Sequence, residues 1–410
     1  MEEGDAEPEA EARSNLALLR HPNFGPYFLG NLLSNCGTWF QNIAQALLIF
    51  RLTGSTFLVG VVNFAQFVGV FALAPWAGSA ADRFDRRRLL IVTQVGAVVV
   101  TALLALLSAA DLAPAPVVIF MALLLGLSTA FAIPALQALV PLLVSTTDLG
   151  PAIALNSVSF TLARAVGPAL GAIVVGSLGI AAAFAFNSVS YLALIVALFI
   201  IKPTEQGHRT RERPRLADSV KLLRDDAYLA AMLLIVAGVT LATDPVSTLT
   251  PGFATHVFHH SDSLTGYLVA AFGSGSVVAG LTIAGRSGEP ERRIAVTGVI
   301  LGVGMVGFGL APNVGVALVM LFIAGFGFLA TTTTTTTVLQ LRVDDRLRGR
   351  VMALWSVAFL GMRPFGSLID GGAAAGIGLR GAAVVMAVPS FAVAAMVTVT
   401  LVRRGRAAGG

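Results

Sequence analysis

The sequence contains few charged residues and only one cysteine. Asp, Glu, Lys and Arg make up 12% of its 410 residues and hydrophobic residues make up 56%, whereas an average soluble protein is about 25% charged. So little charge cannot cover the surface of a water-soluble protein of this length, which excludes a disordered chain and an ordinary cytosolic enzyme. The single Cys36 allows no intrachain disulfide and no cysteine metal site, which excludes a disulfide-rich secreted scaffold.

Signals for secretion, catalysis and nucleic-acid binding are also missing. Six of the first eleven residues are acidic, whereas a cleavable signal peptide begins with a basic region. No Ser-His-Asp set, phosphate-binding loop or HExxH motif is present, so we expect no enzyme activity, no cofactor and no bound metal. The net charge of +5 is not gathered on one basic face, so we expect no nucleic-acid partner.

Long apolar runs are what the sequence has in abundance, and the mean hydropathy is +0.83. A membrane-spanning helix needs roughly 20 apolar residues, and over that length in lipid a helix can satisfy its own backbone polar groups. The sequence therefore predicts an all-α membrane protein with twelve transmembrane helices, at 24–50, 56–81, 89–108, 116–143, 152–175, 180–201, 228–254, 264–285, 294–311, 314–339, 351–372 and 380–402.

The Lys and Arg residues indicate how these spans are oriented. If the N-terminus is cytoplasmic, Arg51 and Arg380 are the two basic residues in outer loops, and Arg164 and Arg363 lie within spans. The other 23 of the 27 basic residues then fall on the cytoplasmic side. Because cytoplasmic loops are enriched in Lys and Arg, we expect a multi-pass protein of the cell membrane with both termini in the cytoplasm.

A polar, basic loop divides the spans into two sets of six. The expected organisation is an N-terminal tail, a six-helix bundle, a cytoplasmic linker loop, a second six-helix bundle and a C-terminal tail, at 1–23, 24–201, 202–227, 228–402 and 403–410.

The two halves share a short pattern. Phe, Arg and Gly of the fifth span recur in the eleventh at an offset of 199 residues: Phe160, Arg164 and Gly167 correspond to Phe359, Arg363 and Gly366. Because Arg is rare inside membranes, the match favours an internal repeat over a chance similarity between Gly- and Ala-rich helices. Two related six-helix halves are typical of transporters, whose substrate site lies between the repeats near the membrane midplane.

The loop between spans two and three carries a glycine, an acid and a run of arginines: Gly78, Asp82, Arg83, Arg86, Arg87 and Arg88. The glycine lets two helices approach closely, the acid can cap or pair with the next helix, and the arginines can anchor at the inner lipid surface. A simple basic loop is the alternative. The segment resembles the signature loop Gly-x-x-x-Asp-Arg-x-Gly-Arg-Arg of the major facilitator superfamily, with Asp85 at the position of the second glycine.

This resemblance implies the major facilitator fold, in which two pseudo-symmetric six-helix bundles rock about a central site. In that family the acid and the arginines of the loop form a cytoplasmic charge network that holds the outward-open state and breaks during the cycle. Carried over to this sequence, Asp82, Arg83 and Arg87 are the gating candidates. The corresponding segment of the second half, 285–293, matches the pattern poorly.

The fifth span contains Gly167, Pro168 and Gly171. Proline removes a helix hydrogen bond and glycine permits a tight crossing, so the segment is predicted to be a bend and packing site. It resembles the Gly-Pro-x-x-Gly core of the superfamily's antiporter signature, which favours export over import.

Further segments resemble the drug-exporter branch that includes enterobactin exporters and macrolide efflux proteins; they lie at 18–24, 37–41, 52–55 and 348–354. The resemblance covers residues 16–402. Two features depart from the pattern. Thr38 stands where the branch often has an acid after the glycine of span one, and span four lacks the Arg that many proton antiporters carry.

A polar stripe runs along the first span. Asn31, Asn35, Thr38, Asn42 and Gln45 follow one another at intervals of three and four residues, which places them on one face of a helix, and Gln41 flanks this face. Span two adds Asn63 and Gln66, three residues apart. Such a stripe must face protein or water in a membrane. It is predicted to line the substrate cavity; bonding between helices is the alternative.

Charged residues within the spans are few. Arg164 and Arg363 each lie twelve residues into their spans, roughly 18 Å deep at about 1.5 Å per residue. Asp244 is well inside span seven, and Asp370 follows Arg363 by seven residues on the same face, toward the outer edge. Deep charges indicate function or a fixed structural pair. The functional hypothesis is that Asp244 carries a proton and the arginines bind polar or anionic parts of a substrate.

Two unusual clusters remain. The threonine run 331–337 falls in span ten, where threonine can bond to the preceding turn, and one third of the run is a candidate for cavity lining. The group His256, His259, His260 and Asp262 has spacing similar to that of metal ligands, but an interfacial loop is the favoured interpretation.

The sequence therefore predicts a monomeric secondary transporter that exports a small organic molecule, such as a drug, siderophore or other natural product, in exchange for protons. Its expected partners are this substrate, protons and the lipid bilayer. A solute importer working as a symporter is one alternative. A polytopic membrane enzyme is another, although it would need paired acids or histidines at one membrane face.

Overall fold

The computed structural model describes residues 15–203, 222–283, 288–343 and 345–408, and in this part of the chain all regular structure is helical. The first half contains α1 (Asn15–Leu19), α2 (Phe24–Thr53), α3 (Thr56–Ala72), α4 (Ala74–Arg83), α5 (Arg86–Ala109), α6 (Ala115–Leu139), the short 3-10 helix η1 (Val140–Leu142), α7 (Leu149–Leu178) and α8 (Ile180–Ile200).

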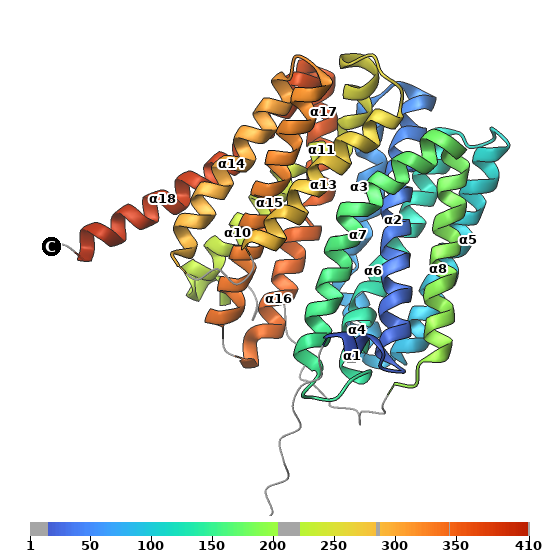
Figure 1. Ribbon diagram of the computed structural model, residues 1–410, viewed down its shortest axis with the longest axis horizontal. Helices are drawn as coiled ribbons and strands as arrows, with labels where there is room; N and C mark the ends of the chain where they lie inside the picture. The colour runs from blue at the N-terminus through green and yellow to red at the C-terminus, as the bar shows by residue number, and fades with distance from the viewer. Residues whose placement is uncertain (1–14, 204–221, 284–287, 344, 409–410) are drawn as a thin grey trace, which may run out of the picture.

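The second half stands beside the first (Figure 1). It contains α10 (Ala227–Thr243), α11 (Pro245–Thr248), α12 (Thr250–Gly252), the π-helix η2 (Phe253–Val257), α13 (Ser263–Ile283), α14 (Pro290–Leu310), α15 (Val314–Arg342), α16 (Asp345–Leu360), α17 (Arg363–Val385) and α18 (Val388–Ala408).

Each of the twelve predicted spans coincides with a helix or with a helix interrupted by a break. By length and composition, eight helices in the described residues can cross a membrane, or nine when α3 and α4 count as one bent span. One of the eight, Leu354–Val399, covers both spans predicted at 351–372 and 380–402. Gly378 separates these two spans, because its φ of 76° interrupts the helix. The predicted all-α fold is confirmed.

Three spans that the sequence predicts as continuous are broken in the structure. The second span bends by 57° between α3 and α4, where Pro75 follows the break. The seventh span is divided at Pro245 and Pro251, and the eleventh restarts at Pro364 in the first turn of α17. Proline has no backbone N–H and clashes with the preceding turn, so a new helix begins more easily at proline than an old one continues.

Buried apolar side chains form separate clusters in the two halves. One cluster extends from Leu229 to Val397 in the second half, and two others lie entirely within residues 18–201. The tail 1–14 and most of the predicted linker, 204–221, lie outside the described residues. The predicted C-terminal tail begins within α18, which continues to Ala408. The domain boundaries stay predictions.

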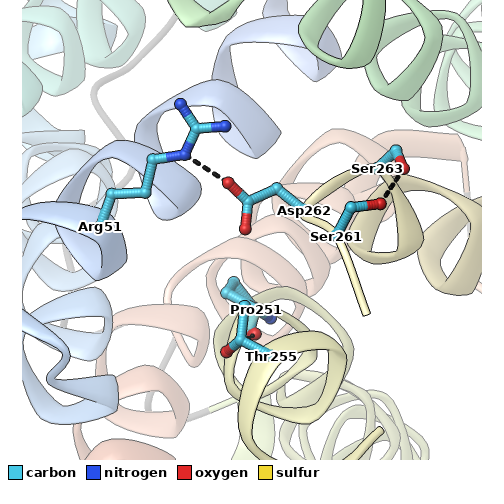
Figure 2. Close-up of polar contacts among 6 residues, drawn as sticks. All are labelled: Arg51, Pro251, Thr255, Ser261, Asp262 and Ser263. Carbon is cyan, nitrogen blue, oxygen red and sulfur yellow. Dashed lines mark hydrogen bonds and ion pairs between the residues drawn. The ribbon is translucent and has the colours of Figure 1, made fainter. Parts of the chain in front are cut away.

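The two halves meet along α3 with α17 and along α7 with α13. We call the end of the molecule where α2 passes into α3 the distal end; the sequence predicts that it faces outside. There Arg51 of α2 forms an ion pair with Asp262, just before α13 (Figure 2). Next to this pair, the ring of Phe50 contacts that of His256 at a centroid distance of 5.1 Å. These contacts connect the two halves at the distal end.

Candidate functional site

Asp244 lies at the break in the seventh span, between α10 and α11, and is 4% exposed. Its Oδ2 accepts a hydrogen bond of 2.6 Å from the hydroxyl of Ser367 on α17 and a longer one of 3.4 Å from Thr248 on α11. The break places this carboxyl where a side chain from another span can reach it. Asp244 therefore accepts hydrogen bonds from side chains of two spans, the seventh and the eleventh.

Thr248 also connects Asp244 to the first half of the molecule. The side-chain amide of Asn63 on α3 donates to the Thr248 hydroxyl at 3.4 Å. Close packing brings these helices together, because a Cβ atom at Gly60 of α3 would overlap the carbonyl oxygen of Ser367. A chain of polar contacts thus runs from Asn63 through Thr248 to Asp244.

Arg363 is half-buried at the first residue of α17. Its guanidinium lies over two rings of the first half, 5.1 Å from the centroid of Phe67 and 5.9 Å from that of Trp39. It also interacts electrostatically with Asp244. Cation–π contacts with the first half and attraction to an acid of the second hold this deep charge at the interface.

Asp370 is fully buried two helical turns beyond Arg363. Ser367, one helical turn before Asp370 on α17, holds the Asp244 carboxyl at this face of the helix, and the two carboxyls interact. From its position in the sequence we expected Asp370 near the outer edge of the span; the structure places it in the same buried cluster as Asp244. We call Asp244, Arg363 and Asp370 the charge cluster.

Amide side chains of the first half form a continuous network. Asn187 of α8 donates to Gln41, whose amide donates to Gln45 at 3.3 Å. Gln45 donates to Gln66 of α3 at 3.0 Å, and Gln66 donates to Asn42 at 2.8 Å. Gln41 and Gln45 are almost fully buried. Their amides therefore bond helix to helix.

The rest of the predicted stripe is less uniform. Asn31 donates to Asn156 of α7 at 2.9 Å, and the Thr38 hydroxyl lies 3.2 Å from that of Tyr191 on α8. Asn35 and Asn42 are half-buried. The stripe thus contains both interhelical contacts and partly accessible amides, and cavity lining stays a prediction for Asn35, Thr38 and Asn42.

The signature loop bridges the end of α4 and the start of α5. Gly78, Asp82 and Arg83 lie on α4, and both Asp82 and Arg83 are exposed. Asp85 caps α5, because its Oδ1 accepts a hydrogen bond of 2.7 Å from the backbone N–H of Arg88. The second glycine of the family pattern is thus replaced by a good N-cap residue.

Arg87 of this loop reaches another span. Its guanidinium donates to the carbonyl oxygens of Leu198 and of Phe199, the latter at 3.0 Å, and lies 5.8 Å from the ring centroid of Phe199. These carbonyls belong to the last turn of α8, whose dipole favours a cation. In the described residues Asp82 has no ion-pair partner, and the gating role of the loop stays a prediction.

Helix α7 runs without interruption through the Gly-Pro-x-x-Gly segment. Gly167 packs on Trp39, since an added Cβ would lie 2.6 Å from the Cβ of that residue. Gly171 packs on the backbone of Phe40, with a corresponding distance of 3.1 Å. The glycines are therefore packing positions between α7 and α2. The side chains of Arg164 and Pro168 lie outside the described residues, and a bend in transport stays a prediction.

The two unusual clusters have local partners. Five hydroxyls of the threonine run donate to the carbonyl four residues earlier, and Thr331 also lies 2.7 Å from Thr297 of α14. His256, His259 and His260 are exposed, and Asp262 pairs with Arg51. Among the described residues, no group of three or more His, Cys, Asp or Glu side chains is arranged to hold a metal ion.

A family described as transmembrane secretion effectors matches residues 13–408. The chain belongs to this family, within the major facilitator superfamily. The chain is similar to a staphyloferrin A transporter of Staphylococcus aureus, with 23% identity over 84% of this chain and 87% of that protein. It is also similar to the enterobactin exporter EntS of Citrobacter koseri, with 25% identity over 87% of each chain. The family is one of transporters, as predicted, and not of enzymes.

Solved structures show the same fold at lower identity. A D-xylose–proton symporter superposes with a TM-score of 0.70 and 15% identity, covering 94% of this chain and 97% of its own. A bacterial homologue of the human lysosomal transporter Spinster has a TM-score of 0.69 and 17% identity, covering 92% and 95%. The predicted major facilitator fold is therefore confirmed.

Several residues around the charge cluster and the amide network were not predicted from the sequence. Asn187 carried a usable signal, because an amide in an otherwise apolar span needs a partner. Ser367 and Thr248 carried none, since hydroxyl residues are common in spanning helices and usually bond to their own preceding turn. Nothing in the sequence distinguishes Trp39 and Phe67 from other aromatic residues, because their contact with Arg363 is formed only in the folded protein.

Proposed function

We propose that this protein exports a small organic molecule from the cytoplasm in exchange for protons, by alternating access of its two six-helix halves. The substrate class is a siderophore, a drug or another natural product. The family assignment supports transport, and the names of the relatives, a staphyloferrin A transporter and an enterobactin exporter, support a siderophore and outward movement.

The observation that carries the proton part is the position of Asp244. Asp244 is a buried carboxyl between two spans and is linked through Thr248 to Asn63 of the other half. Its hydrogen bonds therefore depend on how the two halves are packed. Buried ionisable residues in membrane transporters mark ion and proton pathways. A proton on Asp244 would change the hydrogen bonds that the carboxyl can accept, and so the contact between the halves.

Substrate contacts are proposed for the partly accessible side chains near the interface. Asn35 and Asn42 offer amide donors and acceptors, Trp39 and Phe67 offer aromatic faces, and Arg363 offers a guanidinium. Such a mixture of aromatic surface with a few polar groups suits a large natural product with several oxygen atoms. The threonine run contributes little to this site, because its hydroxyls bond mostly to their own helix.

The orientation proposed from the basic residues places the distal end outside the cell and both termini in the cytoplasm. In this proposal the ion pair between Arg51 and Asp262 holds the outer ends of the two halves together, and the cytoplasmic side opens to receive substrate. We propose that the monomer is the transporting unit, because each chain carries both halves.

Inside-out membrane vesicles test this function. With an acidic lumen, we expect accumulation of staphyloferrin A, enterobactin or a macrolide in vesicles that contain the protein, and its loss when an uncoupler collapses the gradient. Asp244→Asn keeps the size of the side chain but cannot take up a proton, so it should lower accumulation at least about tenfold, which corresponds to about 1.4 kcal/mol. Asp111→Asn is the matched control, because Asp111 is exposed in a turn at a positive φ that Asn also accepts.

Export that persists with the uncoupler, or full activity of Asp244→Asn, would reject proton antiport. Uptake of the same compounds by right-side-out vesicles with an acidic medium would instead establish an importer. These outcomes use the same protein preparation and differ only in the orientation of the membrane and the gradient.

A further inference from the structure

The two buried acids of the charge cluster differ in their partners. Asp244 accepts hydrogen bonds from Ser367 and Thr248. Both carboxyl oxygens of Asp370 are buried, and neither has a hydrogen-bond donor among the described residues. A buried carboxylate without a donor is costly, so Asp370 needs a partner that the protein's own donors do not supply. The carboxyl of Asp244, which Ser367 holds one turn away on the same face of α17, interacts with Asp370 and can share a hydrogen with it.

The charges around this pair can be counted. Arg363 interacts with Asp244, which in turn interacts with Asp370. Helix α3 contains no ionisable residue. The charged residues of α2 and α14 lie in their end turns, as Arg51, Glu291, Arg292 and Arg293. Helix α2 also carries the ionisable Tyr27 and Cys36, and Tyr228 and Tyr267 lie near the starts of α10 and α13. On α17 itself, Arg380 donates to the carbonyl oxygens of Gly309 and Ala311. With both acids ionised, the cluster has two negative charges and one positive charge.

A net charge buried inside a membrane protein is strongly unfavourable, and one bound proton brings this cluster to neutrality. Two carboxyls in contact cannot easily both be ionised, and they titrate as a pair. We propose that Asp244 and Asp370 form a carboxyl pair that holds one shared proton, and that Arg363 limits the number of protons to one. The inference rests on the proposed function in that this shared proton is the one exchanged for substrate.

The geometry assigns a distinct task to each residue. The proton bridges the two carboxyls, so Asp370 gains the hydrogen bond that it otherwise lacks. Ser367 and Thr248 orient the Asp244 carboxyl, and Arg363 neutralises the charge that remains. When the proton leaves, the pair carries two negative charges, and repulsion within it acts on α11 and α17 together. Asp370 is thus a proton-binding residue and not a structural one.

Infrared spectroscopy of the purified protein counts the proton without a transport assay, because a carboxylic acid has a C=O band that a carboxylate lacks. At neutral pH we expect one such band that disappears in alkaline solution. In Asp370→Asn the remaining acid is balanced by Arg363, so the band should be lost, and the same holds for Asp244→Asn. In Arg363→Gln two protons are needed for neutrality, so the band should double, whereas Arg363→Lys should keep it single.

Asp111→Asn is the control, because Asp111 is exposed in a turn and lies outside the charge cluster. It should leave the band unchanged. Gel filtration establishes that each variant is folded; should one aggregate, the other acid variant and Arg363→Gln still test the same charge count. The proposal is overturned if Asp370→Asn keeps the wild-type band, or if the wild-type protein has no band at neutral pH.

A sodium site is the competing possibility for a set of oxygen ligands, and it has its own signature. Loss of the band on adding sodium chloride, but not choline chloride, at constant pH would overturn the proton pair. The proposed function can fail independently of the carboxyl pair. If export persists with the uncoupler while the infrared bands are as expected, proton antiport is rejected and the carboxyl pair is supported.

Discussion

The hydroxyl of Ser367 donates a hydrogen bond of 2.6 Å to Oδ2 of Asp244. The two residues are 123 positions apart in the sequence and lie on different spans. Ser367 also donates to the carbonyl oxygen of Arg363 at 3.0 Å, the usual choice of a serine within a helix. The bond to Asp244 is therefore an additional one, and it exists because the seventh span breaks at Pro245.

Replacing Ser367 by Ala tests this contact. A hydrogen bond to a charged group contributes about 1.5–3 kcal/mol, so we expect Ser367→Ala to lower pH-gradient-driven export by about tenfold or more. Ser367→Thr keeps the hydroxyl and should retain most of the activity. The measurement is the initial rate of accumulation in inside-out vesicles at equal protein content. Equal rates for the Ala and Thr variants would show that the hydroxyl is irrelevant.

Gly366 provides a steric test of the same site. An added Cβ would lie 3.1 Å from the Cβ of Asp244 and 3.3 Å from its Oδ2, so Gly366→Ala should displace the carboxyl at a cost of about 1–3 kcal/mol. We expect a lower melting temperature of the purified protein and slower export. Gly372→Ala is the control on the same helix, because Gly372 has open space around it. It should be neutral or stabilising, and an equal loss in both variants would contradict the packing argument.

The ion pair between Arg51 and Asp262 predicts a conformational effect. The side chain of Arg51 is 51% exposed and that of Asp262 is 18% exposed, so the pair contributes no more than about 1 kcal/mol and is screened by salt. Arg51→Gln should therefore increase the population with an open distal end by up to about fivefold. Spin labels at Ser55 and Ser261 would report this as a longer distance.

The matched control for this pair is the charge swap, Arg51→Asp with Asp262→Arg, which should restore the shorter distance. High salt should bring the wild-type protein toward Arg51→Gln. An unchanged distance distribution in Arg51→Gln at low salt would mean that the pair does not hold the distal end closed.

The contacts of Arg87 predict that replacing it lowers the stability of the protein more than replacing another arginine of the same loop. It donates to two carbonyls at the end of α8, so Arg87→Ala should destabilise the protein by about 1–2 kcal/mol. The exposed Arg83 is the control at the other end of the loop, and Arg83→Ala should change stability by less than about 0.5 kcal/mol. Thermal unfolding in detergent measures both. Equal melting temperatures for the two variants would remove the capping role of Arg87.

Much of the architecture follows from local sequence properties. The length of each apolar run determines where a span occurs. Lipid offers no hydrogen-bond partners, so the backbone that crosses it must form its own hydrogen bonds, as a helix does. The scarcity of intramembrane charge by itself limits the candidate coupling residues to Arg164, Asp244, Arg363 and Asp370. The loop signature is sufficient to indicate the superfamily.

Contacts between the spans are decided only by tertiary structure. In the sequence Asp370 stands seven residues after Arg363, and nothing there places it near Asp244, because their proximity depends on the break at Pro245 and on the packing of α11 against α17. Nor can the sequence assign Gln41 and Gln45 to interhelical bonding, since a polar stripe looks the same whether it faces water or another helix. Periodicity identifies the face of a helix, whereas long-range packing determines which residue that face meets.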